Sequence, residues 1–210
     1  MPLVRDSMRH QIKQLLLERI MDGTYKPGDR LVELQIAQEF KTSQAPVREA
    51  LRDLEALRVV ESESYRGTRV REVTERELRE TYQVRGVLEE LAAQLAAPRL
   101  KGNVKALERE MAGIVKSARA NDVKSYVEHN TAFHRKIIES ADNAILLRAW
   151  DGLVMETRSR ITLLHLKSDL TKTAREHEPI LEALRDGDGA KAGRLLRAHI
   201  DAFFSGVSGS

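Results

Sequence analysis

Three histidines and one asparagine occupy positions where helical periodicity predicts a buried apolar face. Asn130 and His134 share one predicted stripe, His177 lies on a second stripe and His199 on a third. A buried polar group without a partner reduces folding stability by about 1–3 kcal/mol, so a fold that buries four of them must provide them with a common binding partner. Three imidazole nitrogens and one amide oxygen form a donor set that suits a divalent ion. The pattern therefore predicts a site for zinc, nickel or manganese at these four residues.

Two other interpretations of the histidines stay open. Each histidine alone is typical of a hydrogen-bonded core residue, and together they could line a hydrated pocket without metal or bind a ligand directly. Alternatively, three histidines and one open position build a catalytic zinc site, here for a small carboxylate or ester. That enzyme lacks a visible general base, because helix geometry is expected to turn Glu128, Glu176 and Glu178 away from the shared face.

A second group of side chains has the chemistry to read DNA. Gln44, Arg48 and Arg52 follow one another at intervals of four residues and form an outward stripe on a predicted helix. Arginine can bind guanine O6 and N7 with two hydrogen bonds, and glutamine can do the same with adenine N6 and N7. The stripe alone also fits an ordinary solvated helix face, so its interpretation depends on the elements around it.

Those elements have the order of a winged helix-turn-helix domain over residues 1–72. Three helices are predicted, and two short strands joined by a hairpin loop at 62–67 follow the third helix. The predicted helices are 7–22, 33–40 and 45–58, and the strands are 59–61 and 68–70. In this layout one helix enters the major groove and the wing contacts the DNA backbone or minor groove.

The second part of the chain is predicted to be an all-helical bundle. A linker at 73–77 leads into residues 78–205, and the small polar residues 206–210 form a flexible tail. Six helices are expected, at 78–97, 103–120, 122–141, 143–165, 171–186 and 188–204. The fold class is thus mostly α, a winged helix-turn-helix followed by a helical effector domain.

Composition excludes several classes of protein. The chain has 210 residues and no cysteine, which rules out disulfides, thiolate metal sites and a cysteine nucleophile. No run approaches 18 apolar residues and no signal-peptide pattern is found, so we expect a cytoplasmic protein without a membrane span. The net charge of +3 is too small to indicate DNA binding by itself.

The first 72 residues resemble the reader domain of the GntR family of bacterial transcription regulators. The match runs over residues 10–71 and is carried by Pro27-Gly28-x-x-Leu31, by the PVREAL run 46–51, and by the Arg66-Gly67 wing. The resemblance implies DNA contact from Arg48 and from the wing tip. With the start and the outward stripe of the third helix, the predicted DNA-binding residues are Ser43, Gln44, Arg48, Arg52, Arg66 and Gly67.

Two positions depart from that family pattern. Gln44 stands where the family often has arginine, which should change the base preference there. Arg58 stands where the family often has glycine before the first wing strand, and a local variation of the backbone is expected.

Residues 78–203 resemble the FCD effector domain of the FadR-like subgroup. The motifs are Arg85-x-x-Leu88-Glu89, Asn130-x-x-Phe133-His134, Glu176-His177 and His199. Metal-binding members use Asp or Asn with three His at these places, which implies the ligand set Asn130, His134, His177 and His199. In that family a small carboxylate often completes the metal's coordination.

Arginines are candidates for the other end of such an acid, because a guanidinium matches a carboxylate. Arg85 is the candidate by motif position, and Arg158 and Arg160 are weaker candidates. Arg85 equally fits a helical ion pair with Glu89. The sequence thus predicts a homodimeric transcription regulator, not an enzyme. It would bind a pseudo-palindromic double-stranded DNA operator and respond to a small organic acid.

Overall fold

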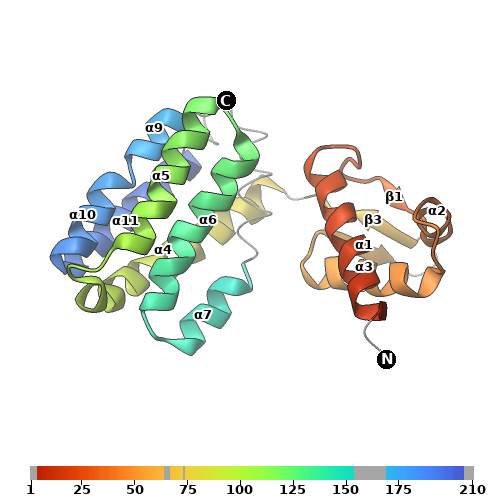
Figure 1. Cartoon of the computed structure of the whole chain (residues 1–210), viewed down its shortest axis with the longest axis horizontal. Helices are drawn as coiled ribbons and strands as arrows, with labels where there is room; N and C mark the ends of the chain where they lie inside the picture. Colours follow the sequence, from red (N-terminus) through yellow and green to blue (C-terminus); the bar gives the residue numbers. More distant parts are fainter. Residues whose placement is uncertain (1–3, 64–66, 73, 154–168, 206–210) are drawn as a thin grey trace. The chain divides into compact units, whose positions relative to one another are not determined.

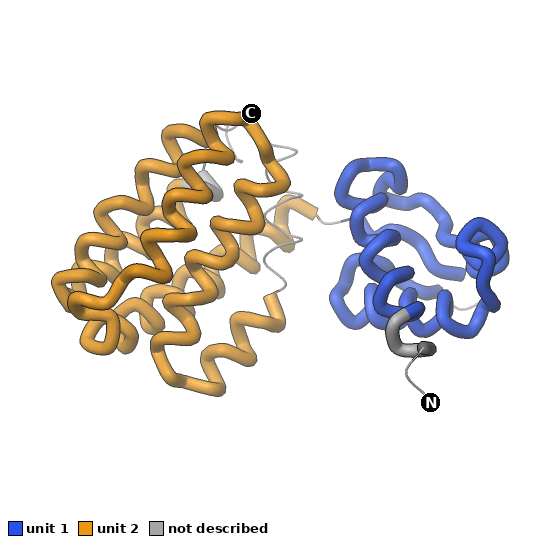
Figure 2. The backbone as a smooth tube through the Cα atoms, viewed as in Figure 1, with its two compact units in different colours: residues 1–73 blue, residues 74–210 orange. Residues whose placement is uncertain are grey.

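The chain folds into two compact units, shown by colour in Figure 2. A computed structural model describes residues 4–63, 67–72, 74–153 and 169–205. The units comprise residues 1–73 and 74–210, and each has its own hydrophobic core. Among the described helices, none has the length and apolar composition that crossing a membrane would require.

The first unit combines three helices with a small sheet. Its elements are α1 (Val4–Met21), β1 (Arg30–Leu31), α2 (Glu33–Glu39), α3 (Gln44–Ala56), β2 (Val60–Glu63) and β3 (Gly67–Val70). The sheet has the order β1-β3-β2 and is antiparallel, with Val60 opposite Val70 and Leu31 opposite Thr68. The winged helix-turn-helix prediction is confirmed. The two-residue strand β1 was not predicted, because two residues are too few for an alternating pattern.

The core of this unit explains how α3 is held. One face of α3, with Val47, Ala50, Leu51 and Leu54, is buried, and α3 packs against α1. The opposite face is left for solvent. Between α3 and β2 the chain turns at Arg58, whose φ of +54° lies in the left-handed region that favours glycine. Arg58 therefore adopts a backbone conformation that glycine would adopt more readily, at some conformational cost.

The second unit is a helical bundle. Its described helices are α4 (Glu75–Leu100), α5 (Lys105–Ala120), α6 (Val123–Ser140), α7 (Ala144–Asp151), α9 (Leu170–Arg175), α10 (Glu178–Asp186) and α11 (Gly189–Ser205). Figure 1 shows the long helices running side by side, with α4 packed on α11 and α5 on α6. Side chains of Thr74, Asp122, Asn143 and Asp169 accept backbone N–H bonds at four helix starts, which fixes those boundaries.

Several predicted boundaries in this unit were wrong. Helix α4 begins at Glu75 and continues past Pro98 to Leu100, so part of the predicted linker 73–77 and the segment after 97 belong to it. The predicted helix 143–165 ends at Asp151 in its described part. Residues 154–168, with the candidates Arg158 and Arg160, lie outside the described residues.

The predicted helix 171–186 is two helices that meet at Glu176–His177. The physical reason is Pro179 in the first turn of α10. Proline has no N–H for the carbonyl four residues earlier, and its ring clashes with that carbonyl, which belongs to Arg175 at the end of α9. This break between α9 and α10 sets the direction in which the side chains of His177 and Glu176 point.

Candidate functional site

The first candidate site is the exposed face of α3. Gln44, Arg48 and Arg52 are exposed, whereas Val47 and Leu51 between them are buried. Ser43 is the N-cap residue of α3, but its side chain makes no cap hydrogen bond. Backbone N–H groups at a helix start and a hydroxyl beside them are suited to contact a phosphate. The predicted stripe therefore exists as one solvent-facing row on a helix whose other face is fixed in the core.

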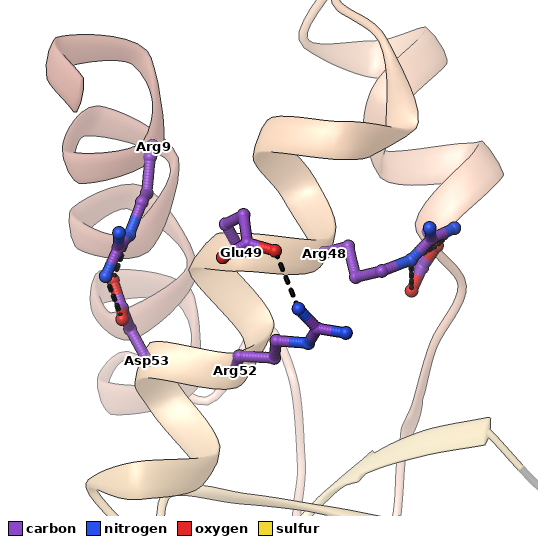
Figure 3. A network of polar contacts seen from close by, with 6 residues as sticks. Arg9, Arg48, Glu49, Arg52 and Asp53 are labelled. Carbon is purple, nitrogen blue, oxygen red and sulfur yellow. Dashed lines mark hydrogen bonds and ion pairs between the residues drawn. The ribbon is translucent and has the colours of Figure 1, made fainter. Parts of the chain in front are cut away.

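Ion pairs hold the arginines of this face (Figure 3). Arg48 Nη2 lies 2.7 Å from Glu33 Oε2 on α2, and its Nε lies 3.1 Å from both carboxylate oxygens. Arg52 Nη1 donates to Glu49 Oε1 at 2.9 Å. On the other side of α3, Arg9 of α1 binds Asp53 through two nitrogens. Arg48 and Arg52 stay exposed in spite of these pairs, so both remain accessible from solvent.

The wing is described on both strands but not at its tip. Residues 64–66 lie outside the described residues, so the DNA contact predicted for Arg66 stays a prediction. Gly67 is exposed and has a φ of +78°, and a Cβ there would lie 3.3 Å from the Arg30 side chain. Both facts favour glycine at the point where the chain enters β3.

The second candidate site is a buried histidine cluster in the second unit. His134 of α6, His177 at the start of α10 and His199 of α11 are all buried, and one ring nitrogen from each lies within 4.8 Å of the others. The ring centroids of His177 and His199 are 4.4 Å apart, and those of His134 and His199 are 5.6 Å apart. Three of the four predicted ligands are thus brought together from three different elements.

Each histidine is oriented through its Nδ1 atom. The partners are Glu89 Oε2 at 2.5 Å for His134, the Thr173 carbonyl oxygen at 3.1 Å for His177, and Glu176 Oε2 at 3.0 Å for His199. A bond from Nδ1–H to an acceptor leaves Nε2 as the lone-pair nitrogen. The Nε2 atoms of His134 and His177 are buried without a hydrogen-bond partner among the described residues. Such orphaned acceptors are costly in a folded protein, and a cation bound between them would satisfy both.

The fourth predicted ligand, Asn130, is buried on α6 one turn before His134. This spacing places its side chain on the same face of the helix as His134. The structure therefore provides a three-nitrogen cluster capable of holding a metal, with an amide on the adjacent turn.

The candidate Arg85 is part of the surroundings of the cluster. Its Nε donates to Glu89 Oε1 at 2.7 Å, and both side chains are buried. The same Glu89 oxygen accepts a bond of 2.8 Å from the indole Nε1 of Trp150 on α7. Glu89 thus links α4, α6 and α7 beside the histidines. The ion pair between Arg85 and Glu89, which the sequence analysis gave as the alternative to effector binding, is present.

Charges in this region are set by burial and by close partners. Burial lowers the pKa of His134 to about 4, although the Glu89 carboxylate opposes the shift. Burial and the neighbouring histidines also hold the pKa of His177 well below its ordinary value. For Glu89, burial would raise the pKa, but Arg85, His134 and the Trp150 bond together hold it below the usual range. At neutral pH the imidazoles of His134 and His177 are therefore neutral, the form that binds metal.

The metal-free protein should lose stability in acid because of this cluster. Below pH 6.5 the unfolded chain protonates His134, whereas the folded chain does so only near pH 4. The free energy of unfolding should therefore fall by about 2 kcal/mol between pH 7 and 4.5 from this residue, and His177 acts in the same direction. Urea unfolding at several pH values in a chelator measures this. His134→Gln should flatten the profile and His10→Gln should not, and equal slopes in all three proteins would contradict the assignment.

Sequence reasoning missed two side chains at this site. Glu176 was expected to point away, but the helix break places its carboxylate on His199. The signal that could have found it is Pro179, which makes a continuous helix through 175–179 unfavourable. Trp150 was not singled out, although a buried indole usually needs an acceptor.

Comparison with known proteins covers most of the chain. The sequence profile described as "Bacterial regulatory proteins, gntR family" matches residues 8–70, and the profile described as "FCD domain" matches residues 80–202. A curated relative, the probable D-xylose utilization operon transcriptional repressor of Paenarthrobacter nicotinovorans, is 33% identical over 99% of this chain and 92% of its own length. The gluconate operon transcriptional repressor of Bacillus subtilis is 30% identical over 87% of this chain and 78% of its own length.

Solved structures share the architecture. Escherichia coli McbR/YncC matches with a TM-score of 0.78 at 22% identity, over 96% of this chain and 97% of that one. The metal-free FCD domain of TM0439 matches with a TM-score of 0.53 at 17% identity, over 65% of this chain and 96% of that one. At these identities the matches establish the fold.

Proposed function

Because the chain belongs to the GntR family of bacterial regulatory proteins and has an FCD domain, we propose that it is a metabolite-controlled transcriptional repressor. In this proposal α3 and the wing bind a pseudo-palindromic operator, and a divalent ion in the second unit helps to bind a small organic acid. Several curated relatives, among them one from Escherichia coli named for the galactonate operon, are named as transcriptional repressors of sugar or sugar-acid operons. The observation that carries the effector part is the pair of buried, unpartnered Nε2 atoms in the histidine cluster.

DNA binding is supported by the two faces of α3, one of which is buried and the other exposed. The buried face fixes the helix against α1, so the exposed row of Gln44, Arg48 and Arg52 has a defined direction. Arg48 would contact a base edge, Ser43 and Arg52 would bind nearby phosphates, and Gly67 with Arg66 would approach the DNA from the wing. Gln44 would favour adenine at its position.

Metal binding is supported by the donor set and its orientation. His134, His177 and His199 would supply three nitrogens, and Asn130 would supply a neutral oxygen. Glu89, the Thr173 carbonyl and Glu176 would act as hydrogen-bond acceptors that fix the three rings. Zinc, nickel and manganese all suit this set. The ion would provide a positive charge that attracts an anionic effector.

A carboxylate effector fits this chemistry. With three neutral imidazoles and a neutral amide, the metal keeps its full positive charge, which favours an anion as an additional ligand. Gluconate and galactonate, for which two relatives' operons are named, are both hydroxy acids of this class. Arg85 remains the proposed cation for the far end of the acid, and its Nε is already bonded to Glu89. The predicted roles of Arg158 and Arg160 lie outside the described residues and stay predictions.

A catalytic role for the metal is less well supported. Two carboxylates contact the cluster: Glu176 accepts a bond from His199 Nδ1, and Glu89 is bonded to His134, Arg85 and Trp150. Both are engaged in holding other side chains and are not placed as free general bases. Turnover of a small ester or acid by the metal-loaded protein would revive this alternative.

Operator binding and effector response together test the proposal. Genomic fragments selected by the purified protein should share a pseudo-palindromic sequence, and small carboxylates should change the affinity for it only when metal is present. An effector works only if it binds the DNA-competent and incompetent states differently. Selection of no common sequence would overturn the regulator proposal. Equal responses with and without metal would overturn the metal part alone.

Glu89→Gln is expected to lower metal affinity 10- to 100-fold, the range typical for loss of a hydrogen bond to a ligating histidine. Metal titration followed by fluorescence measures it, because Trp150 is the single tryptophan and is bonded to Glu89. Glu90→Gln, which changes the next residue of α4, is the matched control. Since Glu89→Gln leaves Arg85 buried without its carboxylate, the double variant Arg85→Met/Glu89→Gln keeps the test valid if the single variant unfolds. Unchanged affinity in a folded variant would exclude the orienting role.

A further inference from the structure

The hydroxyl group of Tyr126 is a further buried polar group in the second unit that has no partner. Tyr126 of α6 is 1% exposed, and its hydroxyl oxygen has no hydrogen-bond partner among the described residues. A buried tyrosine hydroxyl usually finds a partner, because a buried polar atom without one reduces folding stability. Phenylalanine would fill the same space without this cost. The hydroxyl therefore needs an explanation other than the packing of the core.

The position of Tyr126 on α6 relates it to the histidine cluster. Tyr126, Asn130 and His134 follow one another at intervals of four residues, and all three are buried. Residues at this spacing lie on one face of a helix, so Tyr126 shares the face that carries two of the proposed metal ligands. Along the helix axis its Cα lies about 12 Å from that of His134, at 1.5 Å per residue. Tyr126 is therefore placed to meet a different part of a bound molecule from the part that the metal would hold.

The charged groups that act on this hydroxyl belong to the surroundings of the cluster. Burial raises the pKa of Tyr126, the Glu176 carboxylate raises it further and Arg85 lowers it, so both charges lie within electrostatic reach of the hydroxyl. Glu176 also accepts the bond from His199 Nδ1. Arg85 is bonded to Glu89, the carboxylate that fixes another histidine of the cluster. The hydroxyl therefore faces the same region of the unit as the cluster.

The chemistry of the hydroxyl indicates what would bind it. Because its pKa is raised, Tyr126 is neutral at pH 7, and a neutral phenol can donate one hydrogen bond and accept another. A hydroxyl group on a ligand has the same two capacities, whereas a methylene group has neither. A carboxylate suits this place less well, because the negative charge of Glu176 is near. The group that best matches Tyr126 is therefore a neutral ligand hydroxyl.

We propose that the Tyr126 hydroxyl forms a hydrogen bond with a hydroxyl group of the effector and thereby selects hydroxy acids over unsubstituted acids. This assignment rests on the proposed function, in which the metal binds the carboxylate of the same molecule. It adds to that function the residue that distinguishes the two classes of acid. An unsubstituted acid would leave the Tyr126 hydroxyl buried without a partner, which is how a site rejects a ligand that lacks a hydroxyl.

Matched pairs of acids test this contact by calorimetric titration of the metal-loaded protein. The pairs are glycolate with acetate, lactate with propionate, and gluconate with hexanoate, which have the same carbon chain with and without hydroxyl groups. The wild type should bind the hydroxy acid of at least one pair more tightly than its partner. Tyr126→Phe should lose about 5- to 150-fold in affinity for that hydroxy acid, because the ligand hydroxyl is then buried without a partner. Its affinity for the unsubstituted acid should stay unchanged.

Thermal melting separates recognition of the acid from a structural role of the hydroxyl. Without metal and acid, Tyr126→Phe should melt at or above the wild-type temperature, because it removes a polar atom that has no partner. Tyr25→Phe, in the first unit, is the matched control and should bind the acids like the wild type. A lower melting temperature for Tyr126→Phe, no preference for hydroxy acids in the wild type, or an unchanged preference in Tyr126→Phe would overturn this assignment alone. Binding of no acid by the metal-loaded wild type would overturn the proposed effector as well.

Discussion

His134→Ala is expected to abolish the divalent-ion binding that we propose for the second unit. His134 supplies one of three converging nitrogens, and Glu89 fixes its ring, so the variant leaves two histidines of the cluster. Loss of a direct ligand should reduce metal affinity by more than the 10- to 100-fold range that is typical of outer hydrogen-bond partners. Plasma mass spectrometry of untagged, dialysed protein should find about one ion per wild-type chain and none in the variant.

The same experiment has a thermal readout that separates metal loss from unfolding. Metal at 100 times its dissociation constant stabilises the folded state by about 2.7 kcal/mol, so it should raise the melting temperature of the wild type by several degrees. His134→Ala should melt cooperatively but show no shift when zinc, nickel or manganese is added. His10→Ala, which changes an exposed histidine outside the cluster, should behave like the wild type. Absence of metal from the wild type, with no uptake when these ions are offered, would exclude the site and favour a metal-free pocket.

Arg48→Ala is expected to abolish specific operator binding while leaving the fold intact. The side chain is exposed on α3, so its removal opens no cavity in the core. A bidentate arginine–guanine contact contributes about 1–3 kcal/mol, and a dimer on two half-sites loses it twice. The operator affinity should therefore fall roughly 30- to 25,000-fold at constant salt. Fluorescence anisotropy on operator and scrambled duplexes measures the loss, with Arg185→Ala in the second unit as a control for charge.

The ion pair between Arg48 and Glu33 offers a second explanation for a loss of operator binding, in which Arg48 has only a structural role. A variant of Glu33 distinguishes the two explanations. If Arg48 acts by tying α3 to α2, Glu33→Gln should weaken operator binding as much as Arg48→Ala does. If Arg48 reads DNA, Glu33→Gln should preserve operator binding, because it removes only a competing carboxylate. Sequence-specific binding retained by Arg48→Ala would contradict the docking of α3 that we propose.

The winged helix-turn-helix was predictable because its signals are local. The apolar spacing of Val47, Ala50, Leu51 and Leu54 defines a helix with one buried face, and that face automatically turns Gln44, Arg48 and Arg52 outward. Turn residues then mark where the helices stop. Strand β1 was missed because a strand of two residues exists only through its pairing with β3, which a local pattern does not contain.

For the histidine cluster, the sequence could predict which residues take part and which helix faces they occupy. Periodicity placed polar residues on stripes that must be buried, and the resemblance to a family aligned them as one set. Distances and ring orientation were not predictable, because they depend on how α6, α10 and α11 pack against one another over long separations in sequence. The contact of Glu176 with His199 follows from the break before α10, which a model of one continuous helix excluded.

By itself, therefore, the sequence determined the two kinds of domain, the exposed row of α3 and the identity of the three histidines. The exposed row follows from spacing within one helix, the domain types from the order of the elements, and the grouping of the histidines as one set from the resemblance to a family. Only the tertiary structure decided that the histidines converge with two Nε2 atoms unpartnered, and that Glu89 binds Arg85, His134 and Trp150 together. It also decided that Val84, Val87, Leu91 and Leu95 of α4 are exposed to solvent. Burial and hydrogen bonding are properties of packed elements, and a spacing pattern cannot specify which neighbour fills each face.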